Sequence, residues 1–284
     1  MAENSITPYY LTGKSGSIGK FLCDHLESPF FDIENVRDVE NWFKDRDLKD
    51  KAFLHLAAIV GEAQVKANLD KARRVNIDGT LKLAKLALEH GVNRFLFAST
   101  SHVYKPKPEF IREEDEKFPQ NTYAEMKLEA EIALLEIFKR DLEKLVIFRI
   151  FSILDFDTAS FTLGGRVSDA IKKGDRINIR SALDKRGFLT PLSVSKIIEM
   201  CIHRKLPGGV YNICSSEVIT VKQAVQNMLE MASLPVDWFA FDENYSSAPT
   251  VYGDNSKILK EIPEVESLLH WELKQPKIIR VQNQ

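Results

Sequence analysis

The sequence predicts an α/β fold: a doubly wound parallel sheet with helices on both faces, followed by a smaller mixed α/β C-terminal lobe. Through the first half of the chain, short apolar runs typical of buried parallel strands alternate with helical segments. A glycine-rich turn follows the first of these runs. The alternation loosens after about Asp155, where loops punctuated by proline and glycine follow. Ligands of such sheets bind beyond the carboxyl ends of the strands, so we expect the functional residues there.

The first half supplies four strands and four helices to this prediction. The apolar runs read as strands are Tyr9–Leu11, Ala52–Ala58, Phe95–Ala98 and Leu145–Ile150. The segments with helical spacing are Ile18–Leu26, Val36–Phe43, Asn76–His90 and Tyr123–Phe138. The third of these carries Leu81, Ala84 and Leu88 on one stripe and stops before Gly91, a residue typical of helix C-termini.

The second half predicts a smaller lobe that covers the substrate. Phe161–Lys173 and Val221–Met231 have helical spacing, and Arg176–Ile179 and Val210–Ile213 read as short strands. We therefore expect residues 1–155 to form the sheet domain and residues 156–284 to form the substrate-binding lobe. Segment 186–222 is expected to return to the sheet domain.

Composition excludes several classes of protein. The 284 residues are 44% hydrophobic and 28% charged, with a net charge of −2, which gives no reason to expect a nucleic-acid partner. The three cysteines lack metal-ligand spacing and read as reduced thiols, so no metal is expected. No apolar run reaches the roughly 18 residues of a membrane span, and the start of the chain lacks the pattern of a signal peptide. We therefore expect a cytoplasmic protein without a membrane partner.

The glycine-rich turn predicts a site for the pyrophosphate of a dinucleotide. It lies between the first apolar run and a helical pattern and comprises Gly13, Lys14, Ser15, Gly16, Ser17, Ile18 and Gly19. Glycine lets the backbone approach a phosphate closely, and the N-terminus of a following helix offers it free N–H groups and a positive dipole end. The alternative is an ordinary tight turn, because glycines also serve those.

A second group of residues predicts proton transfer. Tyr123 and Lys127 are four apart on a predicted helix and therefore share a face. A lysine ammonium beside a phenol lowers the pKa of the phenol, so the tyrosine can exchange a proton with a carbonyl or alcohol oxygen. Thr100, between Ser99 and Ser101 at the end of a predicted strand, can hold the same oxygen by a hydrogen bond. The alternative is an ordinary pair on an amphipathic helix.

These features occur together with further segments that carry a family resemblance. The matching segments are Thr12–Gly19, His55–Ala58, Val75–Thr80, Arg94–Tyr104 and Tyr123–Lys127, with weaker matches at Phe148–Phe151, Arg186–Val194 and Val210–Ile213. In this order they resemble the extended short-chain dehydrogenase/reductase family, the NAD-dependent epimerases and dehydratases of nucleotide sugars. Lys14 and the compact segment Asn121–Lys127 resemble the dTDP-4-dehydrorhamnose reductase group. The resemblance implies a Rossmann-type sheet domain.

The resemblance also implies roles for individual residues. Tyr123 would be the catalytic acid/base, Lys127 its pKa partner and a ribose contact, and Thr100 the catalytic hydroxyl. The cofactor, NAD or NADP, would be bound by Tyr123, Lys127, Gly13, Lys14, Ser15, Gly16, Ser17, Ile18, Gly19, Asp32, Ala57, Ala58, Asn76, Ser99 and Ile150. The nucleotide-sugar substrate would be bound by Ser101, His102, Ser152 and Arg186. The alternative for Arg186 is a solvated surface arginine.

One departure from the family pattern leaves the choice of cofactor open. The stretch between Gly19 and Phe53 has room for one helix, a short Phe30–Phe31 strand and another helix, where the family has two strands with a helix between them. Asp32 lies about twenty residues after Gly13, where an acid often hydrogen-bonds the hydroxyls of the adenosine ribose. It also resembles a later aspartate of the family that contacts adenine. We favour the second interpretation. The acid that selects NAD would then be missing, and Lys14 or Arg37 could tolerate the 2′-phosphate of NADP.

Two further departures concern the substrate. Ser101 and His102 stand where the dehydratases of the family have Asp-Glu, which disfavours loss of water. His102 is read as a packing or hydrogen-bonding residue, with an auxiliary base as the alternative. Ser152 and Asp155-Phe156 replace the usual Asn and Gly-Pro, so the contacts of that loop differ from those of the family.

We therefore expect an oxidoreductase or isomerase of nucleotide sugars, acting as a 4-keto reductase or a 4-epimerase. Both reactions use the same residues, so the sequence does not separate them. The alternatives are a catalytically silent cofactor-binding subunit and a reductase of a small non-sugar carbonyl compound. By resemblance we expect a homodimer that pairs the helices Asn76–His90 and Tyr123–Phe138.

Overall fold

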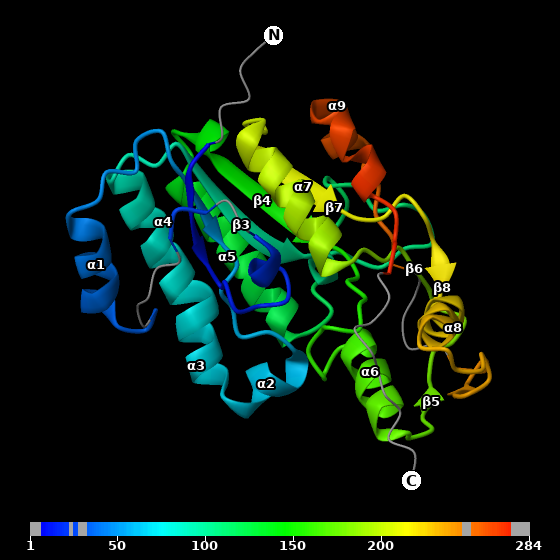
Figure 1. The fold of residues 1–284 in the computed structure, drawn as a ribbon. Helices are drawn as coiled ribbons and strands as arrows, with labels where there is room; N and C mark the ends of the chain where they lie inside the picture. The colour runs from blue at the N-terminus through cyan, green and yellow to red at the C-terminus, as the bar shows by residue number, and fades with distance from the viewer. Residues whose placement is uncertain (1–6, 23–24, 28–32, 246–250, 274–284) are drawn as a thin grey trace.

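The computed structural model, which describes residues 7–22, 25–27, 33–245 and 251–273, is built on a five-stranded sheet (Figure 1). All pairs of neighbouring strands are parallel and follow the order β1-β2-β3-β4-β7. The strands are β1 (Tyr9–Thr12), β2 (Ala52–His55), β3 (Arg94–Thr100), β4 (Leu145–Ile150) and β7 (Gly209–Ile213). Their parallel register places the carboxyl ends at one edge of the sheet. The predicted doubly wound α/β fold is confirmed.

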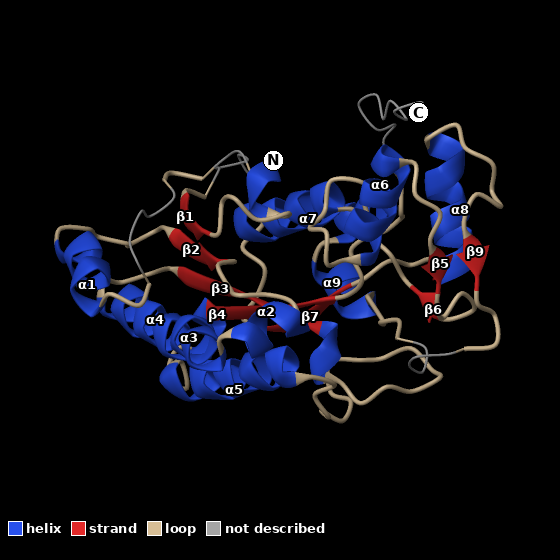
Figure 2. Cartoon of the chain, turned by 90° about the horizontal axis from the view of Figure 1, so that it is seen from below, coloured by secondary structure: helices blue, strands red, loops and turns tan. Residues whose placement is uncertain are grey.

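Helices cover both faces of this sheet (Figure 2). One face is covered by α1 (Val36–Lys44), α4 (Thr80–Glu89) and α5 (Thr122–Ile137). The other face is covered by α7 (Pro191–His203) and α9 (Ser256–Glu261). The strands are buried on both faces, which explains why they appear in the sequence as continuous apolar runs.

The smaller lobe has a core of its own, built from α6 (Leu163–Lys173) and α8 (Val221–Met231). Two short ladders complete it, one of β5 (Asn178–Ile179) with β9 (Ala240–Phe241) and one of β6 (Lys185–Arg186) with β8 (Ile219–Thr220). Strand β7 and helix α7, both within 186–222, pack with the main sheet. None of the helices in the described ranges is long and apolar enough to cross a membrane.

Short helices connect these elements. Between β2 and α4 lie α2 (Glu62–Ala67), α3 (Leu69–Arg73) and a π-helical turn (Arg74–Gly79). The 3₁₀ turns are Gly19–Phe21, Ser101–Val103, Leu142–Lys144 and Pro263–Leu268. The predicted helix over Asn76–His90 thus begins as a π-helical turn, a geometry that often marks a functional site.

The predicted helix over Ile18–Leu26 is wrong. The described part of this segment contains a single 3₁₀ turn. Leu26 donates a hydrogen bond to the Tyr9 carbonyl at 2.6 Å, and Glu27 accepts one from the Leu11 amide at 3.2 Å. These bonds return the chain to the outer edge of β1, which a continuous helix through Leu26 would prevent. The predicted Phe30–Phe31 strand and Asp32 lie outside the described residues.

A buried ion pair ties α5 to the sheet. Glu131 of α5 and Arg149 of β4 are 1% and 4% exposed, and the Arg149 guanidinium binds the Glu131 carboxylate at 2.6 and 3.1 Å. Ser99 of β3 also donates to this carboxylate. Arg149 donates in addition to the Tyr104 hydroxyl at 2.8 Å, which in turn donates to Asn212 of β7 at 2.7 Å. One network therefore spans three strands and a helix.

We predict that Arg149→Met lowers the free energy of unfolding by about 3–5 kcal/mol, because the Glu131 carboxylate loses its buried counter-ion. The double variant Arg149→Met/Glu131→Leu should recover most of this loss. Urea unfolding followed by circular dichroism measures both. Arg73→Met is the matched control, since the Arg73–Glu129 pair is about half exposed and should contribute under about 1 kcal/mol. Equal effects of the two single variants would contradict the prediction.

Candidate active site

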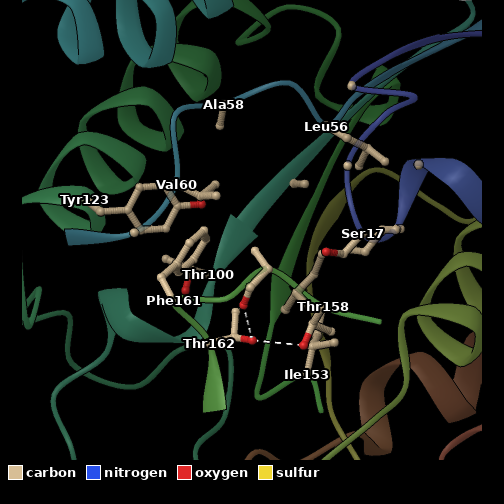
Figure 3. Close-up of a pocket in the computed structure, with 18 of the residues that line it drawn as sticks. Ser17, Leu56, Ala58, Val60, Thr100, Tyr123, Ile153, Thr158, Phe161 and Thr162 are labelled. Atoms are coloured by element: carbon tan, nitrogen blue, oxygen red, sulfur yellow. Dashed lines mark hydrogen bonds between the residues drawn. The ribbon is translucent and has the colours of Figure 1, made fainter. Parts of the chain in front are cut away.

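The carboxyl ends of the strands open into a cavity of about 960 Å³ (Figure 3). Its walls are the glycine-rich turn after β1, the loop after β2, the ends of β3 and β4, the start of α5 and a loop of the smaller lobe. The predicted site residues that line it are Gly13, Ser15, Gly16, Ser17, Ile18, Gly19, Ala57, Ala58, Ser99, Thr100, His102, Tyr123, Lys127, Ile150 and Ser152. The structure thus brings together most of the residues predicted for cofactor and catalysis.

The glycine-rich turn packs against backbone too closely for side chains. Gly13 has a φ of +84°, and a Cβ atom there would lie 2.7 Å from the Ala57 nitrogen. A Cβ atom at Gly19 would lie 2.1 Å from the Gly13 oxygen. Only glycine fits these positions. The turn therefore presents backbone at one end of the cavity, as the pyrophosphate of a dinucleotide requires. In the part of the following segment that the structure describes, one 3₁₀ turn, Gly19–Phe21, comes after it.

The other end of the cavity holds the predicted proton-transfer group. Tyr123 lies in the first turn of α5 and its ring reaches into the cavity (Figure 3). Lys127, one turn later, is 2% exposed, and its Nζ donates to the Ala98 carbonyl at 2.7 Å. The Nζ lies 5.8 Å from the centroid of the Tyr123 ring. Thr100, the last residue of β3, lines the same cavity.

Burial controls the protonation of this pair. Desolvation lowers the pKa of Lys127 to about 7, although the charge of Glu131 opposes it. Desolvation also raises the pKa of Tyr123 above its ordinary value. The expected lowering of the Tyr123 pKa is therefore absent in this state. Both side chains are desolvated, and the lowered pKa of Lys127 makes its ammonium a weaker source of positive charge for the phenol. In this state the Tyr123 phenol is protonated.

His55, whose role sequence reasoning missed, links the end of β1 to the start of α4 through a hydrogen-bonded chain. The ring is fully buried, with Nδ1 2.6 Å from the Thr12 hydroxyl and Nε2 2.9 Å from the Thr80 hydroxyl. Thr80 donates its own proton to the Asn76 carbonyl, so His55 Nε2 donates to Thr80 and Nδ1 accepts from Thr12. Burial and then the charge of Lys127 lower the His55 pKa to about 3, so the ring is neutral. The sequence signal was that Thr12 and His55 are polar residues at the ends of the apolar segments that form β1 and β2; the register that sets them side by side is seen in the structure.

Several predicted residues lie outside the cavity lining. Asn76 is buried in the π-helical turn, where its amide binds the Ile59 nitrogen at 2.8 Å and oxygen at 2.9 Å and so supports the loop after β2. Ser101 is buried and Lys14 is exposed, and neither lines the cavity. Asp32 is outside the described residues.

Arg186 lines a second, smaller cavity of about 370 Å³ in the lobe. The Arg186 guanidinium is 3.3 Å from the Asp184 carboxylate, and its side chain is 17% exposed. Two more arginines line this cavity, Arg166 of α6 and Arg180 after β5. The concentration of guanidinium groups makes this cavity suited to an anion, and the sequence pointed to only one of the three.

The loop before α6 forms the wall of the main cavity that faces the glycine turn. The predicted helix over Phe161–Lys173 starts later, at Leu163, with Thr162 as its N-cap. Thr158 and Thr162 share a hydrogen bond of 2.9 Å at the cavity wall (Figure 3). Asp157 pairs with Lys20, which follows the glycine turn, so this loop and the turn are joined across the cavity.

The family model of the NAD-dependent epimerase/dehydratase family matches residues 9–214. The chain therefore belongs to this family, which confirms the resemblance drawn from the sequence. A nicotinamide dinucleotide, NAD or NADP, is accordingly its cofactor, and the close-packed glycine turn at one end of the cavity fits such a group.

Curated relatives are identical to the chain at about a quarter of the aligned positions. A putative UDP-arabinose 4-epimerase of Arabidopsis thaliana is 23% identical over 84% of this chain and 59% of its own length. A dTDP-D-glucose 4,6-dehydratase of Mus musculus is 25% identical over 74% of this chain and 56% of its own length. A UDP-glucose 4-epimerase of Halalkalibacterium halodurans is 25% identical over 79% of this chain and 72% of its own length. The chain thus spans less than two thirds of the first two relatives.

Solved structures share the fold over almost the entire chain. RMD of Pseudomonas aeruginosa, complexed with NADPH, superposes with a TM-score of 0.81 at 20% identity and covers 97% of this chain and 95% of its own. The NAD complex of a Thermus thermophilus UDP-glucose 4-epimerase superposes with a TM-score of 0.76 at 16% identity and covers 96% of this chain and 97% of its own. At these identities the likeness shows the fold.

Burial of Lys127 should make the free energy of unfolding depend on pH. The pKa of Lys127 is about 7 in the folded chain, below the 10.5 of the free group. The unfolded chain therefore binds more protons between these values, and stability rises with pH across that window. We predict that Lys127→Met, without added nucleotide, is more stable than wild type at about pH 6.5, and that this advantage shrinks by roughly 2 kcal/mol by about pH 9.

Denaturant titrations at the two pH values measure this difference. The control is Lys85→Met, because Lys85 is exposed on α4 and carries no burial cost. A stability difference between Lys127→Met and wild type that is the same at both pH values would contradict the account of Lys127.

Proposed function

We propose that the protein is an NAD(P)-dependent enzyme of nucleotide sugars that interconverts a carbinol and a keto carbon, as a 4-epimerase or a 4-keto reductase. The observation that carries the proposal is the single cavity that joins the glycine-rich turn to Thr100, Tyr123 and Lys127. A dinucleotide that lies along this cavity would extend from the turn toward the tyrosine. The two reactions share this chemistry and differ in whether the hydride returns to the same sugar.

The residues of this chain would manage the proton and the reacting oxygen. When bound, NAD(P) supplies or accepts the hydride at the sugar carbon. In reduction, Tyr123 donates its proton to the carbonyl oxygen, and in oxidation its phenolate takes the proton of the alcohol. The Thr100 hydroxyl would hold the same oxygen by a hydrogen bond. Protonated Lys127 would stabilise the phenolate, and its pKa near 7 keeps both of its forms accessible at neutral pH.

The second cavity supports a nucleoside diphosphate as the anchor of the sugar. Arg166, Arg180 and Arg186 line it together, and guanidinium groups bind phosphate oxygens by paired hydrogen bonds. His102 lines the main cavity, and its pKa is lowered first by desolvation and next by the charge of Arg186, so Arg186 lies within electrostatic reach of that cavity. A diphosphate held by these arginines would leave the sugar to extend toward Tyr123.

We also propose a homodimer through α4 and α5, as expected from the family resemblance. Ile132 and Leu135 of α5 are 61% and 40% exposed, an unusual exposure for apolar residues on a helix of the sheet domain. Ile132→Lys should convert the dimer to monomer in sedimentation experiments, because a buried lysine without a partner opposes association. Lys139→Glu, beyond the end of the helix, is the control. A wild-type monomer would contradict this part of the proposal.

The function is tested by turnover of a panel of UDP-, dTDP- and GDP-sugars and their 4-keto forms with NAD, NADH, NADP and NADPH. We predict that wild type turns over at least one member and that Tyr123→Phe lowers kcat by at least about 100-fold while it still binds cofactor. Tightly bound NAD released by denaturation would indicate the epimerase, and exchangeable NADPH the reductase. Equal inactivity of both proteins, with cofactor bound, would contradict the enzymatic proposal.

A further inference from the structure

His102 lines the main cavity two residues after Thr100, and the mechanism above gives it no task. Its backbone is held on both sides. The amide donates to the Thr100 hydroxyl oxygen at 3.3 Å, and the carbonyl accepts from the Gln120 amide at 3.0 Å. The ring contacts Asn121, whose Nδ2 lies 3.3 Å from His102 Nδ1. The position of the ring is thus set by residues at the start of α5.

The orientation of the Asn121 amide follows from the helix cap. Asn121 is the N-cap of α5, and its Oδ1 accepts a hydrogen bond from the Ala124 amide at 2.9 Å. Only the oxygen of the side chain can accept this bond, so the NH₂ group must be the part that faces His102. An NH₂ group only donates. His102 Nδ1 must therefore be the acceptor, and the proton of the neutral ring must be on Nε2.

The surroundings disfavour a second proton on the ring. A proton on Nδ1 would face the NH₂ group of Asn121, which cannot accept it. Although His102 keeps exposed surface, partial desolvation of its ring, and next the positive charge of Arg186, lower the pKa of His102 below its ordinary value. The ring is therefore neutral at neutral pH, with its only N–H on Nε2.

We propose that Asn121 fixes His102 as a neutral Nε2–H donor, which binds an oxygen of the sugar and does not act as a base. An imidazole takes a proton from carbon only through an unprotonated nitrogen that reaches the substrate. Here the unprotonated nitrogen is occupied by Asn121. His102 is thus a specificity residue and Asn121 its positioning residue. The enzyme then exchanges hydride and proton at one carbon and leaves the C–H bonds beside the ketone intact.

The tautomer is tested on the full-length protein with nitrogen-labelled histidine by NMR, with His102→Gln to assign the signal. We expect wild-type His102 to carry its proton on Nε2. In Asn121→Asp the carboxylate can still cap α5 but only accepts hydrogen bonds, so the Nδ1 of His102 should become protonated. A wild-type ring with its neutral proton on Nδ1, or a tautomer unchanged in Asn121→Asp, would overturn the role of Asn121.

The contact with the sugar rests on the proposed function and is tested with the nucleotide sugar that the panel identifies. His102→Phe should raise KM by about 3- to 10-fold with a smaller change in kcat, and His102→Gln should restore part of the affinity. In heavy water, wild-type product should contain no deuterium at the carbons beside the reacting one. Deuterium there, or an unchanged KM in His102→Phe, would overturn the proposal. If no sugar reacts, the proposed function fails, and the NMR result still decides the tautomer.

Discussion

Helix α5 is tied to the sheet by the buried ion pair of Glu131 with Arg149, and the placement of Tyr123 and Lys127 follows from that tie. The three α5 residues are spaced four apart, so one face of the helix carries the phenol, the ammonium and the carboxylate. Arg149 holds the last of them from β4, while Ser99 holds it from β3, the strand that ends in Thr100. A buried ion pair is a costly way to stabilise a fold, but it tolerates only one geometry. Here that geometry sets α5 against β3, the strand that ends in Thr100.

The opposite end of the cavity depends on the close approach of backbones. Gly13 lies against the loop after β2 with no room for a side chain, and the neutral ring of His55 links Thr12 to Thr80 at the start of α4. The contacts of His55, which is buried, and of His102, which is exposed, each use a hydroxyl or amide partner whose own bonds decide which ring nitrogen carries the proton. The cavity is thus shaped by hydrogen bonds with defined donors.

Much of this was predictable from the sequence, and the failures have physical causes. Strands buried on both faces leave continuous apolar runs, and the proton-transfer residues have local spacing, so the sheet and the grouping of Thr100, Tyr123 and Lys127 could be predicted. The helix over Ile18–Leu26 failed because long-range bonds to β1 override local helical periodicity. Arg149 gave no local signal of its partner, although Glu131 lies four residues after Lys127 and could have been flagged. The lowered pKa of Lys127 depends on burial, which spacing does not report.

The proposed function requires that the main cavity places the nicotinamide of the cofactor next to one carbon of the sugar, and that Tyr123 exchanges a proton with the oxygen on that same carbon. Its most direct test is to incubate the protein and cofactor with nucleotide sugars deuterated at the carbinol carbon, and to locate the deuterium by mass spectrometry. With wild type, the account predicts deuterium on the nicotinamide ring of the cofactor if the enzyme is a reductase, and deuterium retained at the same carbon of the inverted sugar if it is an epimerase; Tyr123→Phe should give neither product. Turnover in which the deuterium of that carbon is lost to water would contradict it.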